Sequence, residues 1–260
     1  MENDTKIICC PKCKKGLQHS NSAGFEGMSG TWKCPECSSN YQSDDSFIYF
    51  IKEDEVFRFS KRTEFIRSIY AKFYTPLTKL MFLPCGGDHN ARQEVLENLE
   101  IKPGSRILET GIGTGDNVHF LDCKLDGCRF YGLDNQVRMI RACAKNADKW
   151  HRPVKLYLAN AEDLPFKDNS FDVVFQLGAF NLFQQKKQAI EEMIRVARPG
   201  SRIVIADETD KATKLFAIFI GRQPPVVPPI DLVPSSMLET YFKIIWNGYG
   251  YLITFRKPVE

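Results

Sequence analysis

Short apolar runs alternate with longer amphipathic segments from Ser105 to the C-terminus. Five of the short runs are rich in β-branched and aromatic residues, which favour strands: 106–109, 129–133, 154–158, 171–176 and 202–206. Helical patterns begin near Thr114, Asn135 and Gln184. Two further runs, 241–246 and 251–256, flank a glycine-containing turn and predict an antiparallel hairpin. The pattern therefore predicts a Rossmann-like α/β fold, a seven-stranded sheet with a C-terminal hairpin.

Helical spacing also precedes this region. Apolar residues recur every three or four positions within 56–81, which predicts an amphipathic helix that Pro76 must break or kink. A second helix is expected to begin at Asn90, with Asn90 and Gln93 as its capping pair, and to end before Lys102. We therefore expect a helical linker or cap over residues 53–100 and the sheet domain over 101–260.

The first 52 residues contain two C-P-x-C motifs, Cys10 to Cys13 and Cys34 to Cys37. Each motif can turn tightly and direct two thiolates at one tetrahedral ion. The spacing predicts a small zinc ribbon over 1–52, closed by a strand at 47–51, with Cys10, Cys13, Cys34 and Cys37 as ligands. Cys9 competes with Cys10, but only Cys10 gives a pair that matches the second motif. The other cysteines, Cys85, Cys123, Cys128 and Cys143, are scattered and are expected in the core.

Composition narrows the class of protein. The chain has 260 residues, 43% of them hydrophobic and 26% charged, with a net charge of +3, which excludes a disordered chain and does not indicate a nucleic-acid binder. The predicted ribbon carries equal numbers of acidic and basic residues, whereas residues 56–79 are basic. That segment could contact RNA or an anionic membrane surface, although packing against the sheet domain is the simpler interpretation. The polar N-terminus and the lack of a long apolar run predict a cytoplasmic location.

The candidate chemistry gathers at Glu109-Thr-Gly-Ile-Gly-Thr-Gly-Asp116, where the first strand turns into a helix. A P-loop would need Gly-Lys-Ser/Thr, which is absent. A dinucleotide fingerprint would need a third glycine at Asp116, where a carboxylate would repel a pyrophosphate. An acidic residue followed by Gly111, Gly113 and Gly115 instead suits a cationic ligand with an amino acid group and a ribose. S-adenosylmethionine is such a ligand.

Polar residues after the next strands support this interpretation. Asp134 ends the second strand, where a carboxylate can bind ribose hydroxyls, although a helix N-cap is an equal alternative for this residue alone. Asn160 and Ala161 follow the third strand, where an amide side chain and a backbone N–H can bind adenine. Gln176 ends the fourth strand and is a further candidate contact. The segment after it should form the acceptor side, with Phe180, Leu182 and Phe183 more typical of core.

These motifs, with 160–172 and 192–200, resemble class I S-adenosylmethionine-dependent methyltransferases, in particular the ubiquinone/menaquinone biosynthesis type. The resemblance covers about 60–257. It implies that Glu109 and the three glycines hold the methionyl part, that Asp134 holds the ribose, that Asn135 and Gln136 hold the adenosine edge, and that Asn160 and Ala161 hold adenine. The family commonly has Asp at the position of Asn160. The arrangement of a metal-binding module in front of such a domain also resembles that of rRNA guanine methyltransferases.

The resemblance implies an S-adenosylmethionine-dependent methyltransferase acting on a small-molecule or lipid, quinone-like acceptor. The alternatives are an RNA base methyltransferase that docks rRNA or tRNA through the ribbon, and an S-adenosylmethionine-binding protein without activity. Methyl transfer chiefly requires alignment of donor and acceptor, so no catalytic residue is assigned. Asp207, Glu208 and His119 are candidates for a base.

The ligand choice in the ribbon can be tested by substitution. We expect Cys10→Ser to lose the zinc, and Cys9→Ser to keep one zinc per chain, measured by elemental analysis of the purified proteins. The opposite pattern would assign Cys9 in place of Cys10. Because four cysteines close the site, we also expect metal removal to unfold 1–51 and to spare cofactor binding.

Overall fold

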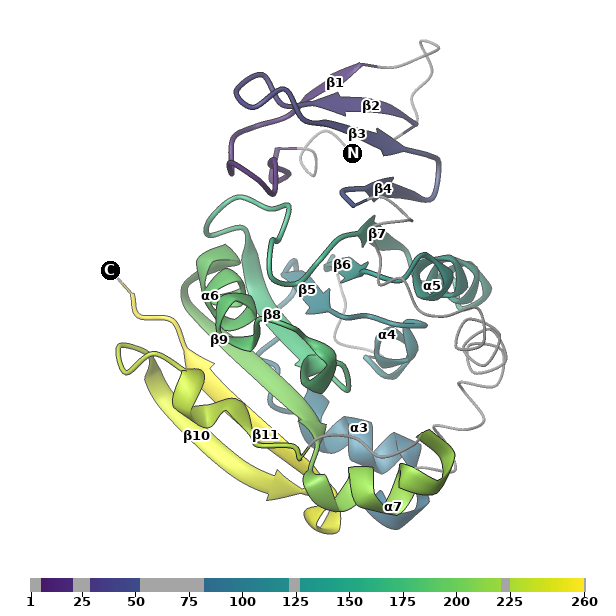
Figure 1. Ribbon diagram of the computed structural model, residues 1–260, viewed down its shortest axis with the longest axis vertical. Coiled ribbons are helices and arrows are strands. Elements are labelled where there is room, and N and C mark those ends of the chain that lie inside the picture. Colours follow the sequence, from purple (N-terminus) through teal and green to yellow (C-terminus); the bar gives the residue numbers. More distant parts are fainter. Residues whose placement is uncertain (1–5, 21–28, 52–81, 122–126, 221–224, 260) are drawn as a thin grey trace.

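A computed structural model describes residues 6–20, 29–51, 82–121, 127–220 and 225–259 of the protein. The amphipathic helix expected within 56–81, and Cys123, lie outside the described residues. In the described part, the strands form one continuous 11-stranded sheet in the order β1-β2-β3-β4-β7-β6-β5-β8-β9-β11-β10 (Figure 1). No helix in these ranges is long and apolar enough to span a bilayer.

Seven neighbouring strands of this sheet form the predicted α/β domain. β5, β6, β7, β8 and β9 are parallel, and β11 pairs antiparallel with both β9 and β10. The seven-stranded sheet with its C-terminal hairpin is therefore confirmed. The strands are β5 Arg106–Thr110, β6 Arg129–Asp134, β7 Val154–Leu158, β8 Phe171–Leu177, β9 Ala197–Glu208, β10 Leu238–Ile245 and β11 Gly250–Arg256.

Helices cover both faces of this sheet, with α3, α4 and α5 on one side and α6 on the other (Figure 1). They are α3 Asp88–Leu96, α4 Asp116–Phe120, α5 Val137–Lys149, α6 Lys186–Val196 and α7 Asp210–Ile220, with 3-10 turns η1 Leu83–Cys85, η2 Phe180–Leu182, η3 Pro229–Leu232 and η4 Trp246–Gly248. The expected cap of α3 is wrong. The helix begins two residues before Asn90, and the Asn90 side chain donates a hydrogen bond to the Gly86 carbonyl (3.0 Å).

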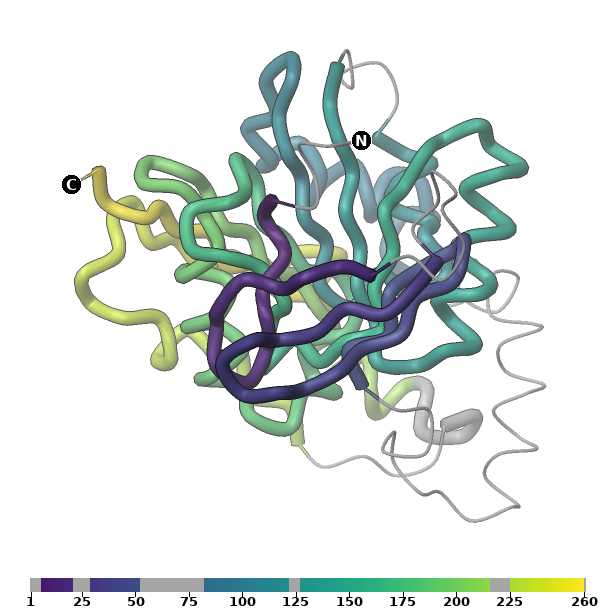
Figure 2. The backbone as a smooth tube through the Cα atoms, turned by 90° about the horizontal axis from the view of Figure 1, so that it is seen from above, coloured from purple at the N-terminus to yellow at the C-terminus, as the bar shows by residue number. Residues whose placement is uncertain are grey.

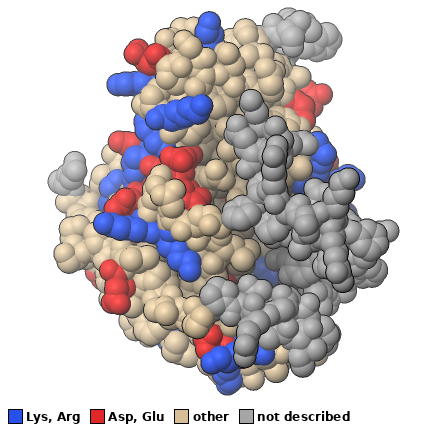
Figure 3. Space-filling view, in the orientation of Figure 1, with Lys and Arg blue, Asp and Glu red and all other residues tan. Residues whose placement is uncertain are grey.

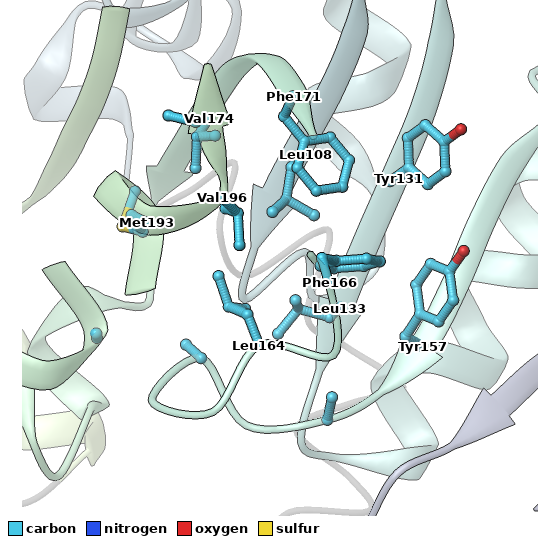
Figure 4. Packing of buried hydrophobic residues seen from close by; sticks show 14 of the residues in the cluster. Leu108, Tyr131, Leu133, Tyr157, Leu164, Phe166, Phe171, Val174, Met193 and Val196 are labelled. Carbon is cyan, nitrogen blue, oxygen red and sulfur yellow. The ribbon is translucent and has the colours of Figure 1, made fainter. Parts of the chain in front are cut away.

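Aromatic side chains fill the core on the α6 face of the sheet. Phe166 lies edge-on to both Tyr157 and Phe171, with ring centroids 5.0 and 4.9 Å apart (Figure 4). Phe166 belongs to the loop after β7, so this loop is anchored by a fully buried ring. Its polar residues are thereby presented at the end of the sheet.

The N-terminal ribbon, described over residues 6–20 and 29–51, continues the same sheet. Its strands are β1 Gln18–Ser20, β2 Gly30–Lys33, β3 Asn40–Ser43 and β4 Phe47–Tyr49. β4 pairs in parallel with β7, and Ile48 lies opposite Tyr157. Viewed from above, the purple ribbon lies in front of the middle part of the later chain (Figure 2). The sequence predicted the closing strand but not its partner.

The ribbon also shares its hydrophobic core with the sheet domain. Ile48 and Phe50 are buried in the cluster that contains Tyr157 and Phe166, and the Phe50 ring lies 6.3 Å from that of Tyr157. This shared core argues against the expectation that metal removal unfolds residues 1–51 and spares cofactor binding, because β7 leads into the loop that carries Asn160 and Ala161. Removing the ribbon would expose apolar surface on β7.

A core substitution in β4 tests this coupling. Ile48→Ala should lower the free energy of unfolding by about 2 to 4 kcal/mol, because it leaves a cavity between the ribbon and β7. We expect urea unfolding measured by circular dichroism and by metal release to a chromogenic chelator to shift together. Ile244→Ala, at a side chain that is 48% exposed, is the control and should change both transitions little. A shift in metal release alone would show that the ribbon unfolds independently.

Candidate cofactor site and cysteine cluster

A pocket of about 410 Å³ opens at the carboxyl ends of β5, β6 and β7. Such ends lie at one edge of a parallel sheet, and ligands bind there where the strand order reverses. The pocket brings together six of the ten residues that the sequence proposed for the cofactor: Gly111, Asp134, Asn135, Gln136, Asn160 and Ala161. The ribbon reaches the same pocket through Ile51, which the sequence did not indicate.

The glycine turn after β5 has the backbone geometry that its sequence requires. Gly111, Gly113 and Gly115 have φ values of 70°, 57° and 81°, in the left-handed region that favours glycine. A Cβ atom on Gly111 would lie 2.7 Å from the Cβ of Ala179, whereas one on Gly113 would meet nothing within 4 Å. The backbone of this turn can therefore approach a ligand closely, with the α4 N-terminus beyond it.

Glu109 is a completely buried carboxyl group just before this turn. Burial raises its pKa to about 8. One carboxylate oxygen accepts a hydrogen bond from the Asn117 side chain, and the other has no hydrogen-bond partner. A buried acceptor without a partner is costly, and a ligand ammonium group would satisfy it. The donor set at this turn therefore fits the amino acid end of S-adenosylmethionine.

Two residues that sequence reasoning missed support Glu109 from behind. Arg92 of α3 donates to the Asn117 side-chain oxygen and, through Nε, to Asp88 (2.7 Å). Asn117 in turn donates to Glu109, so a hydrogen-bonded chain runs from α3 to the turn. Arg92 shares the buried side of α3 with Val95 and Leu96, and a charged residue on an apolar stripe was the available signal.

Asp134 joins the glycine turn to the end of β6. Its carboxylate accepts from the backbone N–H of Gly113 (3.1 Å) and of Gln136 (2.8 Å). Burial raises its pKa to about 6, while these backbone donors oppose the shift. The alternative role as helix cap does not hold, because Gln136 occupies the N-cap of α5 without a side-chain cap. A ribose contact by Asp134 stays a prediction.

Gln176 lies behind the pocket and does not line it. The side chain is fully buried. With its amide oxygen toward the loop after β8, it accepts from the Phe180 N–H (2.8 Å) and donates to the Ala206 carbonyl (3.2 Å). Gln176 therefore holds the loop that carries Leu182 and Phe183. Leu182 is 69% exposed and lines the pocket with Phe183, whereas Phe180 is buried.

The three candidate bases have different surroundings. Asp207 is buried and accepts from the Asn181 backbone N–H (2.6 Å), so it supports the loop after β8. Burial raises the pKa of the adjacent Glu208 carboxyl to about 7, and the Asp207 charge adds to this effect. His119 stacks on Trp150 with ring centroids 4.9 Å apart, in a separate hollow beside α3 and α5. None of the three lines the cofactor pocket.

The four predicted metal ligands meet in the ribbon. The sulfur atoms of Cys10, Cys13, Cys34 and Cys37 all lie within 4.8 Å of one another. The sulfur–sulfur distances are 3.5 Å for Cys10–Cys37 and 3.4 Å for Cys13–Cys34. Two sulfurs that each lie about 2.3 Å from a tetrahedral ion would be about 3.8 Å apart, which is close to these values. Cys9 is buried outside this cluster. The arrangement suits a closed metal site without room for a substrate.

Comparisons with known proteins agree with this geometry. Residues 108–205 match the family profile described as a methyltransferase domain. A demethylmenaquinone methyltransferase of Corynebacterium urealyticum is 30% identical over 161 residues, which are 61% of this chain and 66% of that protein. An O-methyltransferase of Aspergillus nomiae is 29% identical over 59% of this chain and 71% of that protein. The chain therefore spans about two thirds of the length of these relatives.

The fold is shared with a solved methyltransferase. Haemonchus contortus phosphoethanolamine N-methyltransferase 2, solved in complex with S-adenosyl-L-methionine, has a TM-score of 0.56 and is 14% identical over 73% of this chain and 59% of that chain. At this identity the likeness concerns the fold alone. The family match and the sequence relatives identify the later part of this chain as a class I S-adenosylmethionine-dependent methyltransferase domain.

The pKa of Glu109 gives a pH test of its contact. A ligand ammonium binds the ionised carboxylate, and this pKa is about 8 in the free protein. The affinity for S-adenosylhomocysteine should therefore rise with pH below that value, approaching tenfold per pH unit, with proton release on binding.

Titration calorimetry in buffers of different ionisation enthalpy measures both the affinity and the proton release. Glu109→Gln should bind more weakly at pH 8 and lose most of the pH dependence between about 6.5 and 8. Equal pH dependence in the two proteins would remove Glu109 from the ligand contact.

Proposed function

We propose that this protein transfers the methyl group of S-adenosylmethionine to a small apolar acceptor of the quinone or lipid class. The observation that carries the proposal is the unpartnered, buried Glu109 oxygen at a glycine turn, beside a pocket lined by six of the other nine cofactor candidates. An unpaired buried acceptor lowers the stability of the folded protein, so a turn with only a structural role gains nothing from one. A ligand cation would pair with this oxygen.

Each part of the cofactor has a residue of suitable chemistry. Glu109 would hold the α-ammonium group, and Asp134 the ribose hydroxyls. Asn135 and Gln136 would lie along the adenosine, and Asn160 with the Ala161 backbone would bind adenine. Bound in this way, S-adenosylmethionine supplies an electrophilic methyl group, and the chain supplies alignment and exclusion of water.

Apolar side chains favour an apolar acceptor. Leu182 and Phe183 line the cofactor pocket. Phe183 and Leu232 also line a neighbouring open hollow of about 570 Å³, whose other lining residues, within 184–191, are polar or charged. Large apolar groups exposed beside a polar cofactor pocket often mark a ligand surface. The name of the bacterial relative, a demethylmenaquinone methyltransferase, points to an acceptor of this kind.

The cysteine cluster would hold one zinc ion in a structural role. Four thiolates fill a tetrahedral shell, so the ion would leave no open position for catalysis. The ribbon would then contribute to function by pairing and packing with the sheet domain. On the face shown in Figure 3, the acidic and basic side chains of the described residues are interspersed. The basic residues 56–79 lie outside the described part of the chain, so a labelling assay must decide on RNA as an acceptor.

A labelling assay tests the proposed reaction. We expect methyl-labelled S-adenosylmethionine to transfer label to a short-chain demethylmenaquinol and not to total cellular RNA. Leu182→Asp should lower transfer to the quinol about tenfold or more, because it places a charge beside the apolar acceptor, while S-adenosylhomocysteine affinity changes little.

Two results would contradict parts of the proposal separately. Label in RNA, lost steeply as salt rises, would replace the acceptor class and keep the methyltransferase activity. Binding of S-adenosylhomocysteine without transfer to any member of an acceptor panel would favour a binding protein. Gly113→Val is the control that should lose S-adenosylhomocysteine binding. Its added side chain meets no protein atom within 4 Å, but valine disfavours the backbone conformation of this turn.

A further inference from the structure

The metal turn of the ribbon contacts the loop that follows β7. In this turn, residues 10–15, the Lys14 N–H donates to the Cys10 carbonyl (2.7 Å), and Lys14 has a φ of 60°. That conformation directs its side chain across to the loop of residues 159–167, which we call the adenine loop. Lys14 Nζ lies 3.3 Å from the Leu164 carbonyl oxygen and 2.8 Å from Glu192 Oε2.

Glu192 links this lysine to the loop backbone. The residue is buried on α6, and the oxygen that accepts from Lys14 also accepts from the Leu164 N–H (2.7 Å). Arg195 donates to the second Glu192 oxygen (2.6 Å) and to the Leu164 carbonyl (3.1 Å). Both backbone groups of Leu164 are therefore held by a cluster of three charged side chains, one of which comes from the ribbon.

The ribbon holds the adenine loop at both ends. At its start, the Phe50 N–H donates to the Leu158 carbonyl (2.9 Å), and β4 pairs with β7. At its end, the Cys9 N–H donates to the Pro165 carbonyl (2.9 Å), and the Lys167 N–H donates to the Ile7 carbonyl (2.8 Å). Residues 159–163, between these attachments, line the cofactor pocket.

We propose that Lys14 is a positioning residue for the adenine half of the cofactor, through which the metal-loaded ribbon sets the affinity of the pocket. The inference rests on the proposed cofactor placement. A loop fixed before binding loses less conformational freedom when the ligand arrives, so its attachment raises affinity without a direct contact. Loss of the metal would release the turn, and with it the Lys14 contact.

The test compares two neighbouring lysines. Lys14→Met removes the charged head and keeps an apolar stem of similar length, whereas Lys15→Met makes the same charge change at an exposed side chain of the same turn. With zinc content matched by elemental analysis, we expect Lys14→Met to weaken S-adenosylhomocysteine binding about five- to twentyfold, and Lys15→Met to have little effect. Lys14→Arg should restore most of the affinity.

A ligand fragment separates positioning from general damage to the site. Methylthioadenosine contains the adenosine part and lacks the amino acid group. Lys14→Met should weaken its binding by the same factor as for S-adenosylhomocysteine, whereas Glu109→Gln should leave its binding unchanged. Hydrogen exchange at the Leu164 amide should be faster in Lys14→Met than in Lys15→Met, since this amide donates to Glu192.

Each outcome has a definite meaning. Equal affinities and equal exchange in the two methionine variants overturn the proposal. If Lys14→Met loses zinc, the decision passes to Lys14→Gln with its zinc retained: weaker binding and faster exchange at the Leu164 amide support the proposal, and parent-like values overturn it. Failure of the parent protein to bind S-adenosylhomocysteine would instead contradict the cofactor placement itself.

Discussion

The position of the site is set by the point in the sheet at which the strand order reverses. β5 lies in the middle, the chain continues through β6 and β7 on one side, and it then crosses to β8 and β9 on the other. The loops that leave β5 and β8 must diverge from the same edge, and a cleft between them follows from the connectivity. The glycine turn, Asp134 and the loop after β8 meet there because their strands end there.

Burying carboxyl groups at this edge has an electrostatic cost, which hydrogen-bond donors and one positive charge partly offset. The pKa values of Glu109 and Asp134 are both raised by burial, yet each carboxyl accepts hydrogen bonds from donors that favour the charged form. Arg92 supplies a positive charge behind Glu109 through Asn117. The free protein is thus less stable at this edge than a fully paired core would be, and a cationic ligand bound there would offset part of this cost.

The sequence predicted features with a local signal and missed those made by distant segments. The parallel strands were found because strands buried on both faces are continuously apolar, and the turn at Gly111 because only glycine tolerates its backbone. The pairing of β4 with β7 joins segments about a hundred residues apart, and no local pattern specifies a partner at that distance. The link from Lys14 to Glu192 was missed for the same reason, since each side chain alone resembles an ordinary surface charge. Arg92 stood out on the apolar stripe of α3, but its partner Asn117 on α4 had no local signal.

The shared sheet has a consequence for synthesis of the chain. β4 leaves the ribosome long before β7, and a ribbon that folds on its metal as it emerges would present an unpaired strand edge and a bare apolar face. Such an edge would be prone to aggregation until β7 pairs with it. The slow step in maturation should then be the closure of this long-range pairing, and the rate of elongation between the two segments would influence the yield of folded protein.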